Sequence, residues 1–396
     1  HSEVLAMITN IRLENFKCFE MLDIPIAPLT LLCGVNGMGK SSVFQALLAL
    51  RQSVEPARFA VPEELILAGG RVDIGTGTDV LFEDAKEETL RIEVKNDATA
   101  DPYGLSFDYV AHANQWKTNR KSETCQQGPC KGWNELPPVG GDLVYVNAER
   151  VGPRKLYPLQ ETVARRGDIG DRGERSPAYL NPRQGFVFPA DDPRGVPDQN
   201  GKLQAVLEYW LSGVSPGVRL HLEKITEADA LQTRFSFDRK GDVETRPYRA
   251  TNVGFGLSYT LPVLIALLSL PGTLCLIENP EAHLHPQGQA KVAELAALAA
   301  IAGVQVILET HSDHIMDGIR VAVHDAVLTP EQVRFHYFDR VGGRSIVSTP
   351  KLNSDGRLSD WPPGFFDQHD KNLVKLLKPR HCSALDGLKS LESSGF

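Results

Sequence analysis

The loop at residues 34–41 has the residue types and spacing that bind a phosphate chain. Its sequence, GVNGMGKS, fits the pattern G-x-x-x-x-G-K-[ST] completely. Glycines let successive backbone N–H groups face one anion, and the positive end of a following helix adds to the attraction. In such a loop Lys40 reaches the β- and γ-phosphates, and the hydroxyl of Ser41 ligates Mg²⁺. ATP and Mg²⁺ are therefore the predicted ligands.

The elements expected around this loop are those that the motif requires. Residues 29–33 (LTLLC) are typical of a buried strand, and residues 41–51 (SSVFQALLALR) have helical spacing without a breaker. A plain strand-to-helix turn could also carry glycines, but the complete motif between a strand and a helix favours phosphate binding. The predicted nucleotide contacts here are Gly34, Asn36, Gly37, Met38, Gly39, Lys40, Ser41 and Ser42.

A second apolar run ends in residues that suit a metal ion and a water molecule. Residues 273–277 (TLCLI) predict a buried strand that leads into Glu278, where a phosphate-loop enzyme supports Mg²⁺, although a solvated strand end is the simpler alternative. The next residue, Asn279, can orient water by hydrogen bonding but cannot take a proton. Glu281 is the nearest spare carboxylate. It could serve that water or cap the next helix, and the sequence leaves both roles open.

A third apolar run, residues 304–308 (VQVIL), predicts another buried strand and leads into Glu309-Thr-His311-Ser. A histidine directly after such a strand can contact a γ-phosphate and report its presence. Alone it is more commonly a local cap, so the sensor hypothesis for His311 depends on the motifs around it.

Short apolar strands alternate with helices in the C-terminal half, which predicts an α/β layer with parallel strands. No heptads are sustained, so long coiled-coil arms are not expected. We expect four segments. They are an N-terminal lobe (1–110), a β-rich and partly irregular middle (111–249), a C-terminal lobe (250–345) and an extension (346–396). Further strands are expected at 143–146 and 218–238, and helices at 202–212, 256–270 and 287–302.

The composition limits the partners. The net charge is -8, so a nucleic-acid contact would need a local basic patch. The densest basic stretch runs from Arg150 to Arg175, but Asp168, Asp171 and Glu174 interleave with it, which favours a self-paired loop over a DNA-binding surface. No apolar run is long enough to span a bilayer.

The six cysteines are too few for a disulfide framework in so long a chain, and they indicate a reducing, cytoplasmic setting. Cys125 and Cys130 have no second close Cys/His pair, so we interpret them as loop thiols rather than half of a zinc site. The aromatic cluster at 361–366 (WPPGFF) is expected to seal a core edge rather than to dock a partner.

Together these residues resemble the ABC-type ATPases of the RecF, SMC and OLD (overcoming lysogenization defect) branch. Residues 11–19 (IRLENFKCF) are similar to that branch's opening strand pair, with Lys17 beside the nucleotide. Residues 278–286 (ENPEAHLHP) resemble its acidic strand and D-loop, and residues 309–312 (ETHS) match its switch-histidine motif. Residues 252–258 (NVGFGLS) lie where its signature motif belongs, without the LSGGQ form.

Residues 148–154 (AERVGPR) and 360–368 (DWPPGFFDQ) resemble a narrower group. These are short, armless bacterial AAA-type ATPases, found beside a nuclease in anti-phage defence systems such as Septu. The OLD nucleases carry a Toprim domain after the histidine motif. The residues after His311 show no such motif, so any nucleic-acid cleavage is expected to need a partner protein.

The resemblance implies a fold and a set of roles. The fold is an ABC-type ATPase head with a parallel core sheet, an antiparallel β subdomain and an irregular insertion. Two subunits would pack head to tail, with the phosphate loop of one facing the signature segment of the other. Glu278 would support Mg²⁺, Asn279 or Glu281 would orient water, and His311 would sense the γ-phosphate. The partner would contribute Gly254, Gly256 and Ser258.

The departure from the family is Asn279, which stands where the usual catalytic glutamate is found, so slow hydrolysis is expected. The leading hypothesis is an ATP-dependent dimeric switch that regulates an effector, such as a nuclease, in an anti-phage defence complex. One alternative is a DNA-repair or recombination ATPase whose hydrolysis DNA stimulates. The other is an ATP-loaded scaffold that hardly turns over, which Asn279 favours.

Overall fold

The computed structural model describes residues 6–55, 62–98, 102–119, 141–159, 168–196, 201–239, 243–360 and 368–377. The chain divides into two units, His1–Asp360 and Trp361–Phe396. The described part of the second unit is helix α9 (Gln368–Leu377). Cys125, Cys130, Arg165, Arg166 and the aromatic cluster at 361–366 lie outside the described residues. Everything below concerns the first unit.

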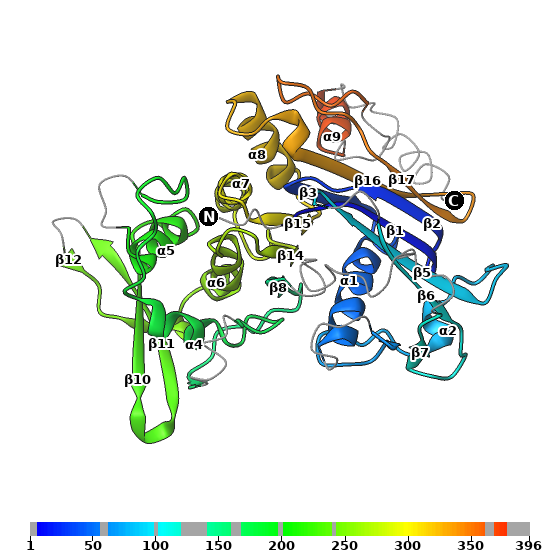
Figure 1. The fold of residues 1–396 in the computed structure, drawn as a ribbon. Coiled ribbons are helices and arrows are strands. Elements are labelled where there is room, and N and C mark those ends of the chain that lie inside the picture. The colour runs from blue at the N-terminus through cyan, green and yellow to red at the C-terminus, as the bar shows by residue number, and fades with distance from the viewer. Residues whose placement is uncertain are drawn as a thin grey trace, which may run out of the picture. The chain divides into compact units, whose positions relative to one another are not determined.

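A six-stranded sheet forms the centre of this unit (Figure 1). Its order is β17-β16-β3-β15-β14-β8, and all neighbouring strands are parallel except β17, which pairs antiparallel with β16. Parallel strands of one sheet end at the same edge, so the residues after β3, β15 and β14 meet there. The bounds are β3 (Leu29–Gly34), β8 (Leu143–Val146), β14 (Leu274–Glu278), β15 (Gln305–Glu309), β16 (Val333–Val341) and β17 (Arg344–Ser348).

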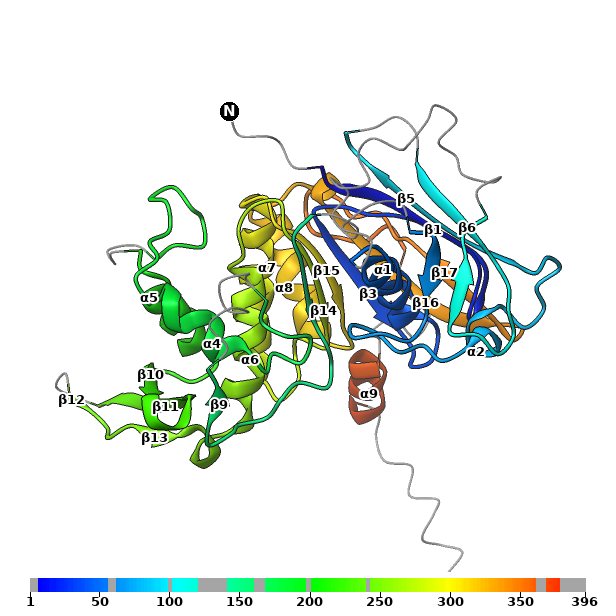
Figure 2. The same cartoon turned by 60° about the horizontal axis from the view of Figure 1, so that its bottom comes forward.

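A four-stranded antiparallel sheet, β2-β1-β5-β6, lies across helix α1 (Lys40–Val54) from the central sheet (Figure 2). Residues of both sheets and of α1 belong to one buried cluster. This position explains why α1 is apolar on several faces: Phe44, Leu47 and Leu48 are all fully buried. Each such side chain contributes about 2 kcal/mol of transfer free energy. The strands are β1 (Ile8–Phe16), β2 (Phe19–Pro25), β5 (Thr89–Asn96) and β6 (Tyr103–Asp108).

The helices of the C-terminal half pack on one another and on the central sheet. Helix α6 (Phe255–Leu267) contacts β14 and β8, while α7 (Pro286–Ile301) contacts α6, β15 and α8 (Asp313–His324). The sequence prediction of an α/β core with a parallel sheet and an antiparallel β subdomain is therefore confirmed. The strands expected at 273–277 and 304–308 and the helices expected at 256–270 and 287–302 are present with small shifts of their ends.

The middle of the chain forms a β ribbon with short helices beside it. Strands β10 (Val218–Ile225) and β11 (Ala230–Arg239) pair antiparallel, and helix α5 (Leu203–Ser212) packs on β10. The short helix α2 lies between the strands of residues 62–118. The remaining elements are β4 (Glu64–Ile66), α2 (Gly77–Val80), β7 (Gln115–Lys117), β9 (Tyr157–Pro158), α4 (Ser176–Leu180), β12 (Val243–Glu244) and β13 (Tyr248–Arg249).

A buried histidine ties the two sheets together. His336 in β16 is fully buried, and its Nε2–H donates to the carbonyl oxygen of Pro25 (2.8 Å), which leaves Nδ1 to accept from the Thr349 hydroxyl (2.8 Å). The pKa of His336 is lowered to about 4, mainly by burial; the Pro25 hydrogen bond opposes this shift and the charge of Arg334 adds to it. The ring is therefore neutral in the folded protein at neutral pH.

This histidine predicts how stability depends on pH. The unfolded chain binds a proton at His336 near pH 6.5, whereas the folded chain does so only near pH 4, so acid favours unfolding between these values. From pH 7 to pH 5 we expect His336 to account for a loss of about 2 kcal/mol. Urea denaturation at both pH values should show a correspondingly smaller loss in His336→Gln. Equal losses in the two proteins would contradict this assignment.

Candidate nucleotide site

The loop between β3 and α1 is in close contact with other parts of the protein at Gly34 and at Gly39, and both positions require glycine. Gly34 has φ +128°, and a Cβ there would lie 2.1 Å from the carbonyl oxygen of Phe338 in β16. Gly39 has φ +97°, and a Cβ there would lie 2.4 Å from the Phe19 ring. Strand β16 and the β1–β2 turn therefore fix the backbone of the loop. Of the other predicted loop contacts, Asn36 and Gly37 are exposed, Met38 packs against the core, and Ser42 is buried.

Lys40 is the first residue of α1, and its ammonium folds back over the loop. Nζ donates to the carbonyl oxygens of Gly34 (3.0 Å) and Val35 (2.8 Å), and the side chain is 3% exposed. Burial lowers the pKa of Lys40, and Glu309 opposes that shift. Neutral carbonyls are weak partners for a buried cation, so a phosphate oxygen in their place would form a stronger, charge-assisted bond.

Three carboxylates gather at the edge of the sheet beside Lys40, each held by its own donors. Glu309, at the end of β15, accepts from the hydroxyl of Ser41 at 2.8 and 3.0 Å. Glu278, at the end of β14, accepts from the Tyr145 hydroxyl (2.9 Å) and the Ala148 N–H (3.1 Å). Glu281 accepts from the Thr310 hydroxyl and the His311 N–H, both at 2.8 Å.

The proximity of these acids perturbs Glu309. Burial raises its pKa to about 7, and the charges of Glu278 and Glu281 add to that shift, while Ser41 and Lys40 oppose it. Within the described residues there is no group of three or more His, Cys, Asp or Glu side chains arranged to hold a metal alone. Magnesium usually combines one or two carboxylates with substrate phosphates and water. The Ser41 hydroxyl and the neighbouring carboxylates therefore fit magnesium that arrives with a nucleotide.

Asn279 occupies a tight turn directly after β14. Its φ is +43°, and its N–H donates to the carbonyl oxygen of Glu309 (2.8 Å). Its side-chain Oδ1 is buried and has no hydrogen-bond partner among the described residues. A buried acceptor without a partner is costly, so this oxygen retains an unused capacity to accept a hydrogen bond.

Arg150 stabilises the turn after β14 by hydrogen bonds to its backbone. Its guanidinium donates to the carbonyl oxygens of Glu278 (3.0 Å) and Asn279, and the residue is 2% exposed. Burial lowers its pKa to about 10, against the nearby acids, which raise it. The sequence placed Arg150 in a basic stretch and in the family-like segment 148–154, where it could face nucleotide or a partner, but it did not predict the contact with the turn after β14. The signal that could have revealed it is the short apolar strand at 143–146, a further strand that ends at the same edge of the sheet.

His311 lies with the loop as predicted from its place after β15. Burial lowers its pKa, and so does the charge of Lys40, while Glu281 and a hydrogen bond with the Gly34 backbone raise it. The imidazole therefore lies between the phosphate loop and Glu281. The structure thus brings together Lys40, Ser41, Glu278, Glu281, Glu309 and His311.

The predicted signature segment packs on the turn after β14. Gly254 caps α6, Ser258 is buried, and a Cβ on Gly256 would lie 3.0 Å from the carbonyl oxygen of His283. The Tyr259 ring meets the His283 ring at 4.6 Å, and the Arg150 guanidinium lies 5.5 Å from the Tyr259 ring. The end of β14 is therefore connected to α6 through side chains in contact, with the Tyr259 and His283 rings edge to face.

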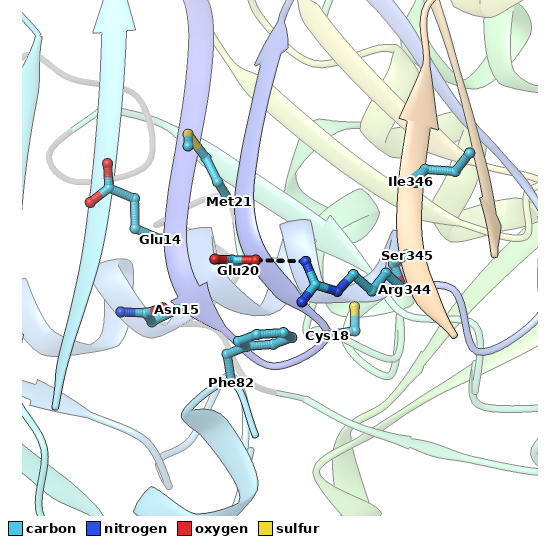
Figure 3. A pocket seen from close by; sticks show the side chains of 9 residues that line it. All are labelled: Glu14, Asn15, Cys18, Glu20, Met21, Phe82, Arg344, Ser345 and Ile346. Atoms are coloured by element: carbon cyan, nitrogen blue, oxygen red, sulfur yellow. Dashed lines mark hydrogen bonds and ion pairs between the residues drawn. The ribbon is translucent and has the colours of Figure 1, made fainter. Parts of the chain in front are cut away.

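A pocket of about 610 Å³ opens beside the β1–β2 turn (Figure 3). It adjoins the phosphate loop, since Cys18, one of its lining residues, lies 2.5 Å from the Cβ position of Gly39. Arg344 crosses the pocket to pair with Glu20 (3.1 Å). Nearby Lys17 donates to Gln45 of α1 (2.7 Å), and burial lowers the pKa of Lys17. The pocket is lined by Glu14, Asn15, Cys18, Glu20, Met21, Phe82, Arg344, Ser345 and Ile346.

The described part of the basic stretch is largely paired within the protein. Arg172 pairs with Glu149 (2.7 Å), and Arg175 with Asp168. Asp171 takes part in an ion pair with Arg71 (3.5 Å). For the described residues 168–175, these pairs agree with the interpretation of a self-paired loop.

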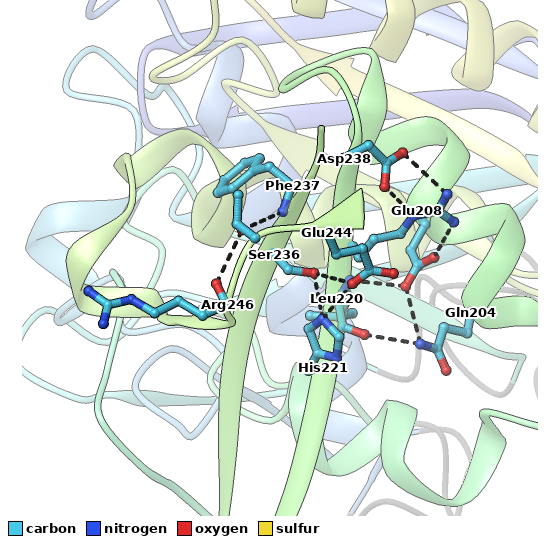
Figure 4. A network of polar contacts seen from close by, with 11 residues as sticks. Gln204, Glu208, Leu220, His221, Ser236, Phe237, Asp238, Glu244 and Arg246 are labelled. Carbon is cyan, nitrogen blue, oxygen red and sulfur yellow. Dashed lines mark hydrogen bonds and ion pairs between the residues drawn. The ribbon is translucent and has the colours of Figure 1, made fainter. Parts of the chain in front are cut away.

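A serine, a histidine and a glutamate meet on the β10–β11 ribbon, but not as a nucleophilic triad (Figure 4). The Ser236 hydroxyl donates to Glu244 (2.8 Å) and lies 2.7 Å from His221 Nε2. Glu244 approaches that same nitrogen (3.8 Å), whereas an orienting acid must hold the other one. Ser236 is also fully buried, so this network is structural.

The fold and the loop geometry define an ATPase of the ABC type. Residues 29–317, more than half of the sequence, match the family described as "AAA domain, putative AbiEii toxin, Type IV TA system", and the chain belongs to that family. Residues 328–376 match a second family, described as a protein of unknown function, DUF3696. An OLD nuclease of Thermus scotoductus is 34% identical over 62 residues, which are 15% of this chain and only 12% of that nuclease.

Solved structures of SMC heads share the fold. An Smc head bound to the C-winged helix domain of ScpA matches with a TM-score of 0.53 at 15% identity, covering 87% of this chain and 98% of that one. An Smc head with an extended coiled coil, bound to the C-terminal domain of ScpA and derived from Pyrococcus furiosus, matches with a TM-score of 0.52 at 12% identity, covering 94% and 100%. These similarities show that the chain shares the fold of SMC heads. Along the described ranges, no helix has the length and apolarity needed to cross a membrane.

The contacts of Arg150 predict that replacing it destabilises the protein much more than replacing Arg172, which lies in the same basic stretch. Arg150→Met removes the Arg150 donors of the Glu278 and Asn279 carbonyl oxygens, of which only the Asn279 oxygen also accepts from the Ala282 N–H, and should destabilise the protein by about 2 kcal/mol. Arg172→Met removes one exposed ion pair and should cost less than about 1 kcal/mol. Urea denaturation measures both. Similar small losses in the two variants would mean that Arg150 does not brace the turn.

Proposed function

We propose that this chain binds ATP with Mg²⁺ at residues 34–41 and hydrolyses it slowly. The observation that carries the proposal is the joint placement of Lys40, the Ser41–Glu309 pair and His311 at one edge of a parallel sheet. A phosphate chain on this loop would meet a cation, a metal-ligating hydroxyl and an imidazole at once. The adjoining 610 Å³ pocket has room for the nucleoside.

Each residue has a proposed task in that reaction. Lys40 binds the β- and γ-phosphates, and Ser41 and Glu278 support Mg²⁺, which would neutralise phosphate charge. His311 contacts the γ-phosphate. The buried Oδ1 of Asn279 can accept a hydrogen bond from the attacking water, and Glu281, held against His311, is the alternative. Asn279 cannot accept the proton, so hydrolysis should be slow.

The four-part division of the chain remains a proposal, with the site built from three parts. The N-terminal lobe (1–110) would supply the loop and the C-terminal lobe (250–345) the acids and His311. The middle (111–249) would supply Tyr145 and Arg150 as supports, and the extension (346–396) has no proposed task.

We further propose that ATP joins two copies head to tail and that this switch controls an effector, such as a nuclease, in anti-phage defence. Gly254 and Phe255 support the first part, because they are exposed at the start of α6, and Phe255 is 54% exposed. The second part is supported by the toxin–antitoxin description of the family. Asn279 also favours a second candidate, an ATP-loaded scaffold that holds an effector and rarely turns over.

Turnover of Mg²⁺-ATP by variants of the purified protein tests the chemistry. Lys40→Ala should abolish binding and hydrolysis. Asn279→Ala should slow hydrolysis about tenfold, since one hydrogen bond to the water is worth about 1.4 kcal/mol. If Glu281→Gln instead stops turnover while ATP still binds, Glu281 orients the water. A parent that binds ATP without turnover above the Lys40→Ala background would favour the scaffold.

Light scattering tests the dimer. With ATP and Mg²⁺ the mass should rise from 43.5 kDa towards twice that value. A side chain at Gly254 meets open space within the subunit, so Gly254→Arg should fold and bind ATP yet fail to dimerise. Gly70→Arg, also in open space, is the matched control and should dimerise like the parent. A Gly254→Arg variant that still dimerises would contradict the head-to-tail arrangement.

A further inference from the structure

Three carboxylates lie at the edge of the sheet, and the order of the strands places Glu309 and Glu278 at different distances from the phosphate loop. Strand β15 lies between β3 and β14, with Glu309 aligned beside Leu32 on one side and Glu278 on the other. Neighbouring strands are about 4.8 Å apart. The backbone of Glu309 is therefore one strand spacing away from the end of β3, where the phosphate loop starts. The backbone of Glu278 is two strand spacings away, about 10 Å.

The hydrogen bonds agree with that order. Among the described residues, it is Glu309 whose carboxylate contacts Ser41, with both oxygens within 3.0 Å of the hydroxyl oxygen. Glu278 is held by Tyr145 and the Ala148 backbone, on the far side of β14. Glu309 is 7% exposed, so water competes weakly for its oxygens.

A serine hydroxyl has one proton to donate and two lone pairs. When that proton is directed to Glu309, the lone pairs face away from the carboxylate. A metal-ligating group that is oriented by such a partner binds its metal more tightly, and loss of the partner typically costs about 10- to 100-fold in metal affinity.

We propose that Glu309 is a positioning residue for the Ser41 hydroxyl, and through it for the magnesium ion that accompanies ATP. The inference rests on the proposed function, because it assumes that ATP binds at residues 34–41. It assigns Glu309 a task beside that of Glu278. The alternative is that the Ser41–Glu309 bond only ties α1 to β15, in which case its loss would change stability but not the response to magnesium.

Equilibrium binding of a fluorescent ATP analogue, with EDTA and with Mg²⁺, distinguishes these cases. The purified full chain and Glu309→Ala should bind the analogue equally in EDTA. Mg²⁺ should tighten binding in the parent, and Glu309→Ala should lose about tenfold of that gain. Glu309→Gln can still accept the Ser41 proton and should restore most of it. Electron paramagnetic resonance with Mn²⁺ and ATP should show more free Mn²⁺ with Glu309→Ala than with the parent.

Two results would overturn the inference: a full magnesium gain in Glu309→Ala, or no restoration in Glu309→Gln. Glu294→Gln, an exposed carboxylate on α7 paired with Lys291, is the matched control and should behave like the parent. A parent that binds no nucleotide in either buffer would contradict the proposed function instead, so the two failures can be told apart.

Discussion

Parallel strands that end at one edge of a sheet bring their terminal charges together, and this molecule must balance three carboxylates there. Glu278, Glu281 and Glu309 share the edge with Lys40, and each uses hydrogen bonds that fix its direction. Burial raises the pKa of Glu309 to about 7, and the charges of Glu278 and Glu281 act in the same direction, so the ionised form of Glu309 is disfavoured at this edge. A cation brought by a nucleotide would stabilise the ionised carboxylates, and for this reason we propose that the edge is a binding site rather than a solvated sheet end.

The surrounding fold holds the edge in place. Arg150 fixes the carbonyl oxygens of Glu278 and Asn279 and packs against Tyr259 of α6. Strand β16 and the β1–β2 turn press on Gly34 and Gly39. The same side chains that shape the turn after β14 therefore also contact the start of α6, where a second subunit would dock. A change in the turn after β14 can therefore alter the start of α6 through these packed side chains.

The sequence predicted much of this arrangement because its signals are local. Residues 34–41 form a complete motif, and the short apolar runs at 273–277 and 304–308 are typical of buried strands. Strand order is not local. The sequence alone could not show that β15 lies between β3 and β14. The sequence analysis therefore predicted a magnesium-binding role for Glu278 and no role for Glu309. Arg150 was missed for a similar reason, since a buried arginine within a basic stretch looks like its exposed neighbours. The assignment of Gly254, Gly256 and Ser258 to a partner's site also stays a prediction.

Binding of ATP at residues 34–41 underlies every role proposed for this site. It can be measured by calorimetric titration of ATP into the purified protein with Mg²⁺ present. We expect saturable binding of one ATP per chain, and no binding by Lys40→Ala folded to the same extent by circular dichroism. No binding to the folded parent, or equal binding to Lys40→Ala, would contradict it.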